Sequence, residues 1–288
     1  MITSDLVRQR VRTLPSMPTT VLALGKAVGD DRCTVDRVLG ILAQDPALSA
    51  ALLRLANSVM YVRDDRVMDL RSAVMRLGFD SIFHLGQSAA IIRSIRGGSH
   101  LDPMRLWQHS VAVGLVAKGI CGLVGQNQHL ETAYLTGLLH DIGKIALDQC
   151  FSEEYGPVVD AMAQGAVCLD AERAILGITH AEVGAMVAAQ WFFPEPMATA
   201  IRDHHEPTSD FLSCLIQLSD LLVRTRIPNS PADENLAFVL EDQPSFKTVF
   251  AGASGANGGA DLDEERLTFG IDDELEHAIT FVKLVFQE

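Results

Sequence analysis

Histidine and aspartate residues recur through the middle of this 288-residue chain, each of them among apolar neighbours. Imidazole and carboxylate side chains that point into an apolar core are costly unless they are paired or bind a metal. If they gather around one cavity, their nitrogen and oxygen atoms suit a divalent ion such as iron or manganese, with magnesium or zinc as alternatives. Seven residues are the candidate metal ligands: His109, His140, Asp141, His180, His204, His205 and Asp220.

The most informative of these residues are the adjacent pair His140 and Asp141, in the segment GLLHDIGK. Neighbouring residues of a helix point about 100° apart because a turn holds about 3.6 residues. The two side chains could therefore approach one metal from different sides, or Asp141 could bridge two ions. Lys144 lies one turn beyond His140, where its ammonium group could contact a phosphate oxygen or a metal-bound hydroxide. A binuclear centre could polarise a phosphoryl group and generate an attacking hydroxide.

The elements that must position these side chains are predicted to be helices. Asp45-Pro46, Asp69 and Asp102-Pro103 each place a capping residue before a helical pattern, and Gly78 lies where a glycine would end a helix. Apolar residues follow helical spacing, and period-two alternation is absent from the sequence. The sequence therefore predicts an all-α fold. The helices expected to carry the candidate ligands begin after Asp102 or span 130–148, 180–192, 196–205 and 209–225.

Domain boundaries are predicted from composition. Gly97-Gly98-Ser99 separates the N-terminal helical region from the histidine-rich region. We expect an N-terminal helical subdomain over 1–98, a helical domain with the candidate metal site over 99–228, and an acidic C-terminal extension with a terminal helix over 229–288. The charge of this extension motivates the idea that it regulates access to the site.

Charge and hydropathy exclude several classes of protein. The net charge of −14 disfavours direct binding to nucleic acid, which needs a basic surface. The apolar stretches are too short or interrupted to span a bilayer, and the N-terminus lacks the apolar region of a signal peptide. The five cysteines are scattered and without CxxC spacing, as in a protein with reduced thiols. We therefore expect a cytoplasmic protein with no membrane partner.

The order of the candidate ligands resembles a known superfamily. His109, His140-Asp141 and Asp220 follow the H…HD…D order of the HD metal-dependent phosphohydrolases. The additional His180 and His204-His205 resemble the binuclear HD-GYP branch, which hydrolyses cyclic di-GMP. The segment after the histidine pair, EPTSDFLS, has no Gly-Tyr-Pro sequence. Specificity for cyclic di-GMP is therefore not implied.

A larger part of the chain, from residue 14 to about 225, resembles the HDOD family, the HD-related output domain of bacterial signalling. This resemblance implies a multi-helix N-terminal subdomain packed on an HD-type helical domain. It also implies a regulatory role with signalling proteins as partners. The segments that carry it are LPSMP (14–18), QDPALSAALLRLANSVMY (44–61), SAVMRLGF (72–79), WQHS (107–110), GLLHDIGK (137–144), LGITHAEVGAMVAAQW (176–191) and IRDHHEP (201–207).

Three functions remain open from the sequence. In the first, a metal-bound HD site serves a signal-transduction module that senses a ligand, such as a phosphorylated small molecule or nucleotide, or binds partner proteins. The second is an active phosphohydrolase or phosphodiesterase with Asp141 and Lys144 as catalytic residues. The third is a scaffold in which the histidines satisfy one another without metal. Both metal-binding hypotheses divide the ligands between two ions. One ion would be held by His109, His140, Asp141 and Asp220. Asp141 would bridge to a second ion, held by His180, His204 and His205.

Overall fold

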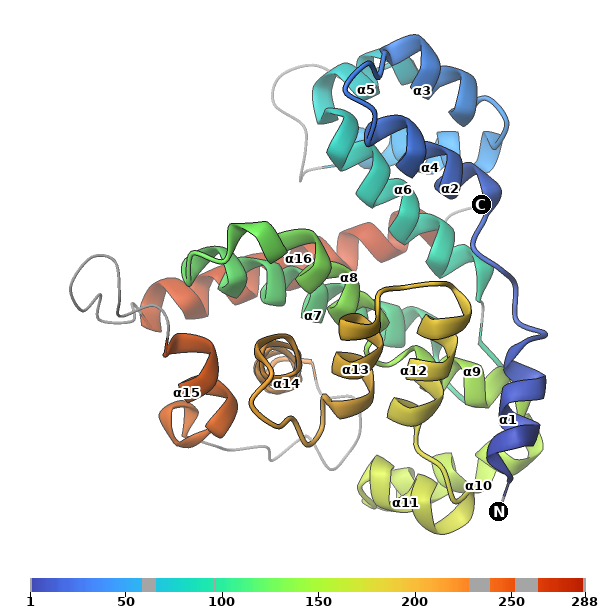
Figure 1. Cartoon of the computed structure of the whole chain (residues 1–288), viewed down its shortest axis with the longest axis vertical. Coiled ribbons are helices and arrows are strands. Elements are labelled where there is room, and N and C mark those ends of the chain that lie inside the picture. Colours follow the sequence, from blue (N-terminus) through green and yellow to red (C-terminus); the bar gives the residue numbers. More distant parts are fainter. Residues whose placement is uncertain (1, 59–65, 96, 228–238, 252–263, 287–288) are drawn as a thin grey trace. The chain divides into compact units, whose positions relative to one another are not determined.

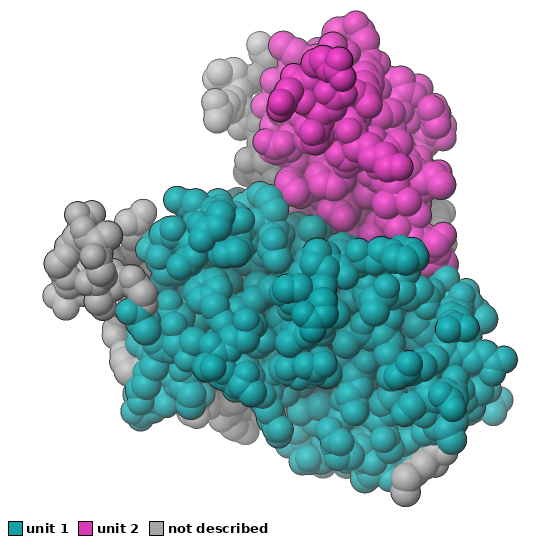
Figure 2. Space-filling model, viewed as in Figure 1, with its two compact units in different colours: residues 1–14, 96–279 teal, residues 15–95, 280–288 magenta. Residues whose placement is uncertain are grey.

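The computed structural model describes residues 2–58, 66–95, 97–227, 239–251 and 264–286, and these contain helices and no strand (Figure 1). The predicted all-α fold is confirmed. The chain divides into two compact units, one of residues 1–14 and 96–279 and the other of residues 15–95 and 280–288 (Figure 2). No helix within the described residues is both long and apolar enough to cross a bilayer.

The smaller unit begins and ends its helices where the local sequence directs. The Asp45 carboxylate accepts from the backbone N–H of Leu48, and Asp69 does the same for Ser72. Gly78, at φ 81°, ends one helix and precedes the next, as a left-handed glycine does at low cost. These predicted caps are confirmed. The helices of this unit are α2 (Thr19–Val28), α3 (Val35–Leu42), α4 (Pro46–Ala56), α5 (Leu70–Leu77) and α6 (Phe79–Ser94).

The larger unit surrounds the long helix α7, which has buried residues along much of its length. Asp102 caps α7 as predicted, accepting from the N–H groups of Met104 and Arg105, and Trp107 is fully buried. The helices of this unit are α1 (Ser4–Val11), α7 (Pro103–Leu123), α8 (Leu130–Leu139), α9 (Ile142–Cys150), α10 (Ser152–Ala163), α11 (Cys168–Ile175), α12 (His180–Gln190), α13 (Glu195–Asp203), α14 (Phe211–Arg224), α15 (Pro244–Phe250) and most of α16 (Glu264–Phe286). Short 3-10 helices span Asn127–His129 and Leu240–Asp242.

The helix expected over 130–148 is interrupted, and this prediction was wrong in detail. Helix α8 ends at Leu139 and α9 begins at Ile142, because Asp141 has φ −99° and ψ 9° and leaves the helical conformation. The pair His140-Asp141 therefore lies at a junction between two helices. Lys144 lies in the first turn of α9 and reaches Asp141, and it does not share a continuous helical face with His140.

The compact units divide the chain differently from the expected segments 1–98, 99–228 and 229–288. Helix α1 belongs with the larger unit, where Arg10 donates to the carbonyl of Cys150 at 2.7 Å. Helix α15 packs against α14 in the same unit, and Ser245 hydrogen-bonds to Gln217. Within the expected C-terminal extension, residues 229–238 and 252–263 lie outside the described residues.

Candidate metal centre

The structure brings all seven candidate ligands together inside the larger unit. His109 comes from α7, the His140-Asp141 pair from the junction of α8 and α9, and Asp220 from α14. His180 is the first residue of α12, and His204 and His205 follow the end of α13. Their ligand atoms form two groups, each with its atoms within 4.8 Å of one another. The triad is His109, His140 and Asp220, and the tetrad is Asp141, His180, His204 and His205.

Backbone contacts at glycines allow these segments to approach one another. Helices α7 and α8 lie side by side (Figure 1), and a Cβ on Gly137 would be 2.6 Å from the Cα of Gly114. A Cβ on Gly143 would be 1.9 Å from the carbonyl oxygen of His180. Any larger residue at Gly143 would push α9 away from the start of α12. The absence of a side chain there brings Asp141 within reach of His180.

The two carboxylate oxygens of Asp141 face different groups of histidines. Its Oδ2 lies 3.4 Å from Nε2 of His140 and 3.9 Å from Nε2 of His109, in the triad. Its Oδ1 lies 3.3 Å from Nε2 of His180 and 3.9 Å from Nε2 of His204, in the tetrad. Asp220 completes the triad, with its Oδ1 3.0 Å from Nε2 of His109. Asp141 thus lies between the triad and the tetrad.

The Nδ1 atoms of three histidines are already engaged away from the cluster. Nδ1 of His140 donates to the carbonyl of Gly137, and Nδ1 of His204 donates to the carbonyl of Ile201, both at 2.7 Å. A carbonyl oxygen can only accept, so the proton must be on Nδ1. Nδ1 of His180 lies 2.7 Å from the Glu172 carboxylate, which also accepts. In all three residues, Nε2 is the atom that faces the cluster.

Several of these inward-facing atoms have no hydrogen-bond partner among the described residues. They are Nε2 of His140 and His204, together with Oδ1 of Asp141, and all are buried. Buried polar atoms without partners are rare and costly in folded proteins. A divalent ion would satisfy them by accepting their lone pairs. The arrangement of the donors therefore fits the mixed nitrogen and oxygen coordination expected from the sequence.

Asp141 also forms a buried ion pair with Lys144. The Lys144 ammonium lies 2.7 Å from Asp141 Oδ2. Burial raises the pKa of Asp141, but His140 and Lys144 outweigh it and hold the pKa well below its usual range. Burial lowers the pKa of Lys144, but the charge of Asp141 outweighs it and raises the pKa above its usual value. Both groups are therefore charged at neutral pH, and Lys144 stabilises the carboxylate at the centre of the cluster.

The histidines of the tetrad have different proton affinities. Burial alone lowers the pKa of His180, but the adjacent Glu172 carboxylate outweighs it, so the pKa lies well above its usual value. Burial, followed by the charges of His140 and His180, lowers the pKa of His204 to about 3. Burial and the neighbouring His204 also hold the pKa of His205 well below its usual value. In the metal-free chain, His180 therefore binds a proton more readily than His205, whose Nε2 is 2.8 Å away.

The histidines of the cluster differ in exposure. His109, His140, His180 and His204 are fully buried, whereas His205 is partly exposed. His205 lines a pocket of about 310 Å³. The charged residues around this pocket are Asp170, Arg173, Glu182, Arg202, Asp203 and Glu206. Carboxylates outnumber guanidinium groups, and Arg202 is already bound to Asp203 through two hydrogen bonds of 2.8 and 2.9 Å. The pocket therefore offers little attraction to a polyanion.

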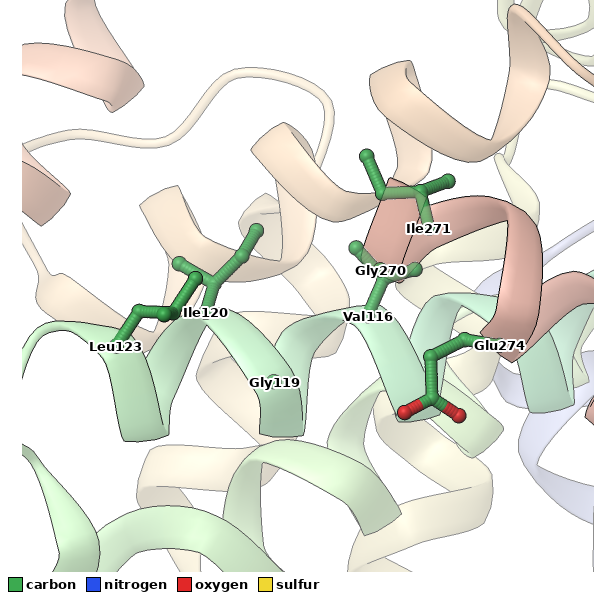
Figure 3. Close-up of a pocket in the computed structure, with 7 residues that line it drawn as sticks. All are labelled: Val116, Gly119, Ile120, Leu123, Gly270, Ile271 and Glu274. Atoms are coloured by element: carbon green, nitrogen blue, oxygen red, sulfur yellow. The ribbon is translucent and has the colours of Figure 1, made fainter. Parts of the chain in front are cut away.

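A second pocket, of about 230 Å³, lies between α7 and α16 (Figure 3). Its lining is mainly apolar, with Glu274 as the one carboxylate among its lining residues. Neither the triad nor the tetrad contributes to it. Of these two pockets, the one beside His205 includes a candidate metal ligand in its lining.

The sequence interpretation missed a carboxylate next to this centre. Glu172, on α11, is fully buried and accepts from both the backbone N–H and Nδ1 of His180. The sequence offers only a weak indication of this role. Glu172 is one helical turn from Cys168 and from Leu176, so its spacing places it on the apolar side of an amphipathic helix. Cys168 also approaches this position, with its Sγ 3.9 Å from Nδ1 of His180.

The all-helical fold and the order of the inward-facing histidines and aspartates agree with the resemblance to HD-type domains drawn from the sequence. Residues 14–207 match the HDOD domain family, and the chain belongs to that family. In sequence, the chain is 27% identical over 202 residues to an uncharacterized protein of Treponema pallidum (strain Nichols). The match covers 69% of this chain and 39% of that protein, so the chain spans well under half the length of that relative.

Solved structures share the fold over nearly the whole chain. An HDOD domain protein of unknown function from Geobacter sulfurreducens is 25% identical, with a TM-score of 0.81 over 99% of this chain and 98% of that chain. A candidate phosphohydrolase from Shewanella amazonensis SB2B is 23% identical, with a TM-score of 0.73 over 98% of each chain. A candidate signal transduction protein from Marinobacter aquaeolei VT8 is 21% identical, with a TM-score of 0.73 over 98% of this chain and 65% of that chain.

Proposed function

We propose that this chain is a signal-transduction module whose HD site binds divalent metal and makes its regulatory or partner-binding state depend on that metal. The observation that carries the proposal is the position of Asp141, with one carboxylate oxygen toward the triad and the other toward the tetrad. Around it, buried Nε2 atoms lack hydrogen-bond partners among the described residues. A scaffold without metal would leave these atoms unsatisfied, so the geometry disfavours the scaffold hypothesis.

The donors support two ions. One would be held by His109, His140 and Asp220 with Asp141, and the other by the tetrad with Asp141 shared between them. Imidazole nitrogen and carboxylate oxygen atoms together suit iron or manganese. We propose one of these as the resident metal.

Burial of the ligands among the described residues supports regulation over turnover. The cluster is buried except at His205, and the pocket beside His205 carries more carboxylates than guanidinium groups. A nucleotide or other polyanion would meet unfavourable charge there. We propose signalling proteins as the partners, and a phosphorylated small molecule of low charge as the alternative ligand.

Phosphohydrolase activity is the second candidate, and the complete ligand set together with Lys144 supports it. Two bound ions would supply polarisation of a phosphoryl group and an activated water. Within the chain, Lys144 would hold the Asp141 carboxylate in its charged form through their 2.7 Å ion pair. The closed surroundings of the site argue for a small substrate if this candidate is correct.

Metal content of the untagged protein, purified without chelator, tests the proposal. We expect about two equivalents of iron or manganese per chain in the wild type, and loss of both in a variant that combines His140→Ala with Asp141→Ala. His129→Ala, which removes an exposed histidine, is the matched control and should retain the metal. No stoichiometric metal after reconstitution under reducing conditions would contradict the proposal.

Turnover distinguishes the two candidates. With bis(p-nitrophenyl) phosphate as the probe, the regulatory proposal predicts no metal-dependent release of p-nitrophenol above that of the His140→Ala, Asp141→Ala variant. If release of p-nitrophenol requires both metal and Lys144, the chain is instead a phosphohydrolase.

A further inference from the structure

One buried carboxylate beside the candidate metal centre belongs to neither the triad nor the tetrad. Glu172 is fully buried on α11, where an unpaired charge would be costly. Three donors satisfy it: the backbone N–H of His180 at 2.8 Å, Nδ1 of His180 at 2.7 Å and the Tyr155 hydroxyl at 3.2 Å. Tyr155 is itself fully buried on α10. Glu172 thus links α10 to the first residue of α12.

Capping of α12 does not explain this carboxylate. The start of α12 already has a capping box, in which Thr179 accepts from the N–H of Glu182 and Glu182 accepts from the N–H of Thr179. Glu172 is a second carboxylate at the same helix start, and it reaches past the backbone to the imidazole ring. Its specific contribution is therefore to the orientation of the His180 side chain.

The consequence for the ring is a fixed direction for Nε2. With Nδ1 donating to Glu172, Nε2 faces Asp141 Oδ1 at 3.3 Å and His205 Nε2 at 2.8 Å. Nδ1 of His140 and of His204 donates to a neutral carbonyl, whereas Nδ1 of His180 donates to a full negative charge. A carboxylate partner makes an imidazole a stronger ligand than a carbonyl partner does.

We propose that Glu172, held in place by Tyr155, is a positioning residue that orients His180 and strengthens its binding to the ion of the tetrad. This inference rests on the proposed metal-binding function. It assigns to α10 and α11 a part in metal affinity, although neither helix contributes a member of the triad or the tetrad.

The test is the affinity of the metal-free full chain for Mn²⁺, measured by calorimetry, in wild type, Glu172→Gln, Glu172→Ala and Tyr155→Phe. We expect Glu172→Ala to weaken binding at one site by about 10- to 100-fold. Glu172→Gln keeps the shape and a hydrogen-bond acceptor but loses the charge, so its loss should be smaller. Tyr155→Phe leaves the Glu172–His180 contact intact and should give the smallest loss.

Asp148→Asn is the matched control because Asp148 is another fully buried carboxylate of the same unit. It accepts from the backbone N–H groups of Gly98, His100 and Leu101, and none of these belongs to the triad or tetrad. We expect this variant to lose stability while keeping wild-type Mn²⁺ affinity. If Asp148→Asn and Glu172→Gln lose Mn²⁺ affinity equally, the loss in Glu172→Gln reflects general destabilisation of the fold. That result would overturn the proposal.

A second readout does not depend on metal. In nitrogen-15 spectra of the histidine rings, wild-type His180 should carry a proton on Nδ1 both with and without metal, and this proton should exchange faster in Glu172→Ala. If the wild type binds no Mn²⁺, the proposed function fails, and these spectra still decide whether Glu172 orients the ring. If the wild type binds Mn²⁺ and both Glu172 variants bind it equally well, the positioning role fails and the metal-binding function stands.

Discussion

At the scale of single residues, the cluster depends on charges that balance one another in a buried environment. Asp141 illustrates this balance, because it faces histidines on both sides and also binds Lys144 at 2.7 Å. Breaking a buried ion pair by removing one partner is far more costly than removing both partners. The same residue is therefore expected to matter for stability and for metal binding, and the two effects can be separated.

Asp141→Asn should lower the unfolding free energy of the larger unit by about 3–5 kcal/mol, because Lys144 would remain as a buried cation without its carboxylate. Adding Lys144→Met should recover most of that loss but none of the metal binding. Hydrogen exchange of peptides from α7 to α14, in chelator, measures the first effect, and metal analysis measures the second. Equal stability of the single and double variants would contradict the role assigned to the ion pair.

Acid pH should destabilise the metal-free chain through His204. Its pKa in the fold is lowered to about 3, below the unfolded histidine value of about 6.5. The folded chain therefore binds this proton less readily than the unfolded chain, so the contribution of His204 is complete above pH of about 6.5 and is lost as pH falls toward the folded pKa.

Between about pH 7 and about pH 5, the wild type should lose roughly 2 kcal/mol more unfolding free energy than His204→Gln. Urea unfolding in the presence of chelator, followed at each pH, provides the measurement. His129→Gln replaces an exposed histidine and should follow the wild-type profile. Parallel profiles for wild type and His204→Gln would show that this histidine does not carry the acid sensitivity.

At the scale of elements, close backbone contacts decide where the ligands meet. A Cβ on Gly143 would lie 1.9 Å from the His180 carbonyl and 2.7 Å from the Gly184 nitrogen, so α9 and α12 touch through their backbones. The atoms that would clash are backbone atoms, which cannot rotate away as a side chain can. The distance between Asp141 and His180 therefore depends on a glycine that is not itself a ligand.

Gly143→Ala should destabilise the larger unit by about 3 kcal/mol and weaken binding of the ion held by the tetrad, because α9 must move away from α12. Gly119→Ala, on α7, is the matched control, since a Cβ there meets nothing within 4 Å. That change should stabilise α7 by up to about 1 kcal/mol through helix propensity. Thermal unfolding and Mn²⁺ calorimetry test both variants, and wild-type behaviour of Gly143→Ala would refute the contact.

At the scale of the whole molecule, all candidate ligands belong to one of the two compact units. The triad and tetrad come from residues 109–220, within the unit formed by 1–14 and 96–279. Metal binding should therefore slow hydrogen exchange in α7 to α14. At a free metal concentration 100 times the dissociation constant, the free energy of opening should rise by up to about 2.7 kcal/mol. Helices α2 to α5 of the smaller unit carry no member of the triad or tetrad and serve as the internal reference.

This protection should disappear in the variant that combines His140→Ala with Asp141→Ala. Exchange mass spectrometry of the full chain, with and without Mn²⁺, gives both results in one experiment. Unchanged exchange in α7 to α14 of the wild type at saturating metal would argue against a metal centre that is part of the folded core.

Much of the local structure follows from the sequence because its causes are local. Asp45, Asp69 and Asp102 cap helices through hydrogen bonds to groups two or three residues away, and apolar spacing alone predicts helices. The order of histidines and aspartates likewise indicated the HD class, and the HDOD family is confirmed. That the seven side chains bind metal remains a prediction, although the structure places them together.

Only the tertiary structure decided the features that depend on distant segments. The break at His140-Asp141 was not evident in the sequence pattern, and Gly143 matters because the His180 carbonyl lies against it. The role proposed for Glu172 depends on its contact with His180. The turn between α11 and α12 brings Nδ1 of His180 to 2.7 Å from the Glu172 carboxylate. A sequence records which groups can donate or accept. Which of them meet in a buried site is set by the packing of helices, where a single Cβ or carbonyl can exclude one arrangement and permit another.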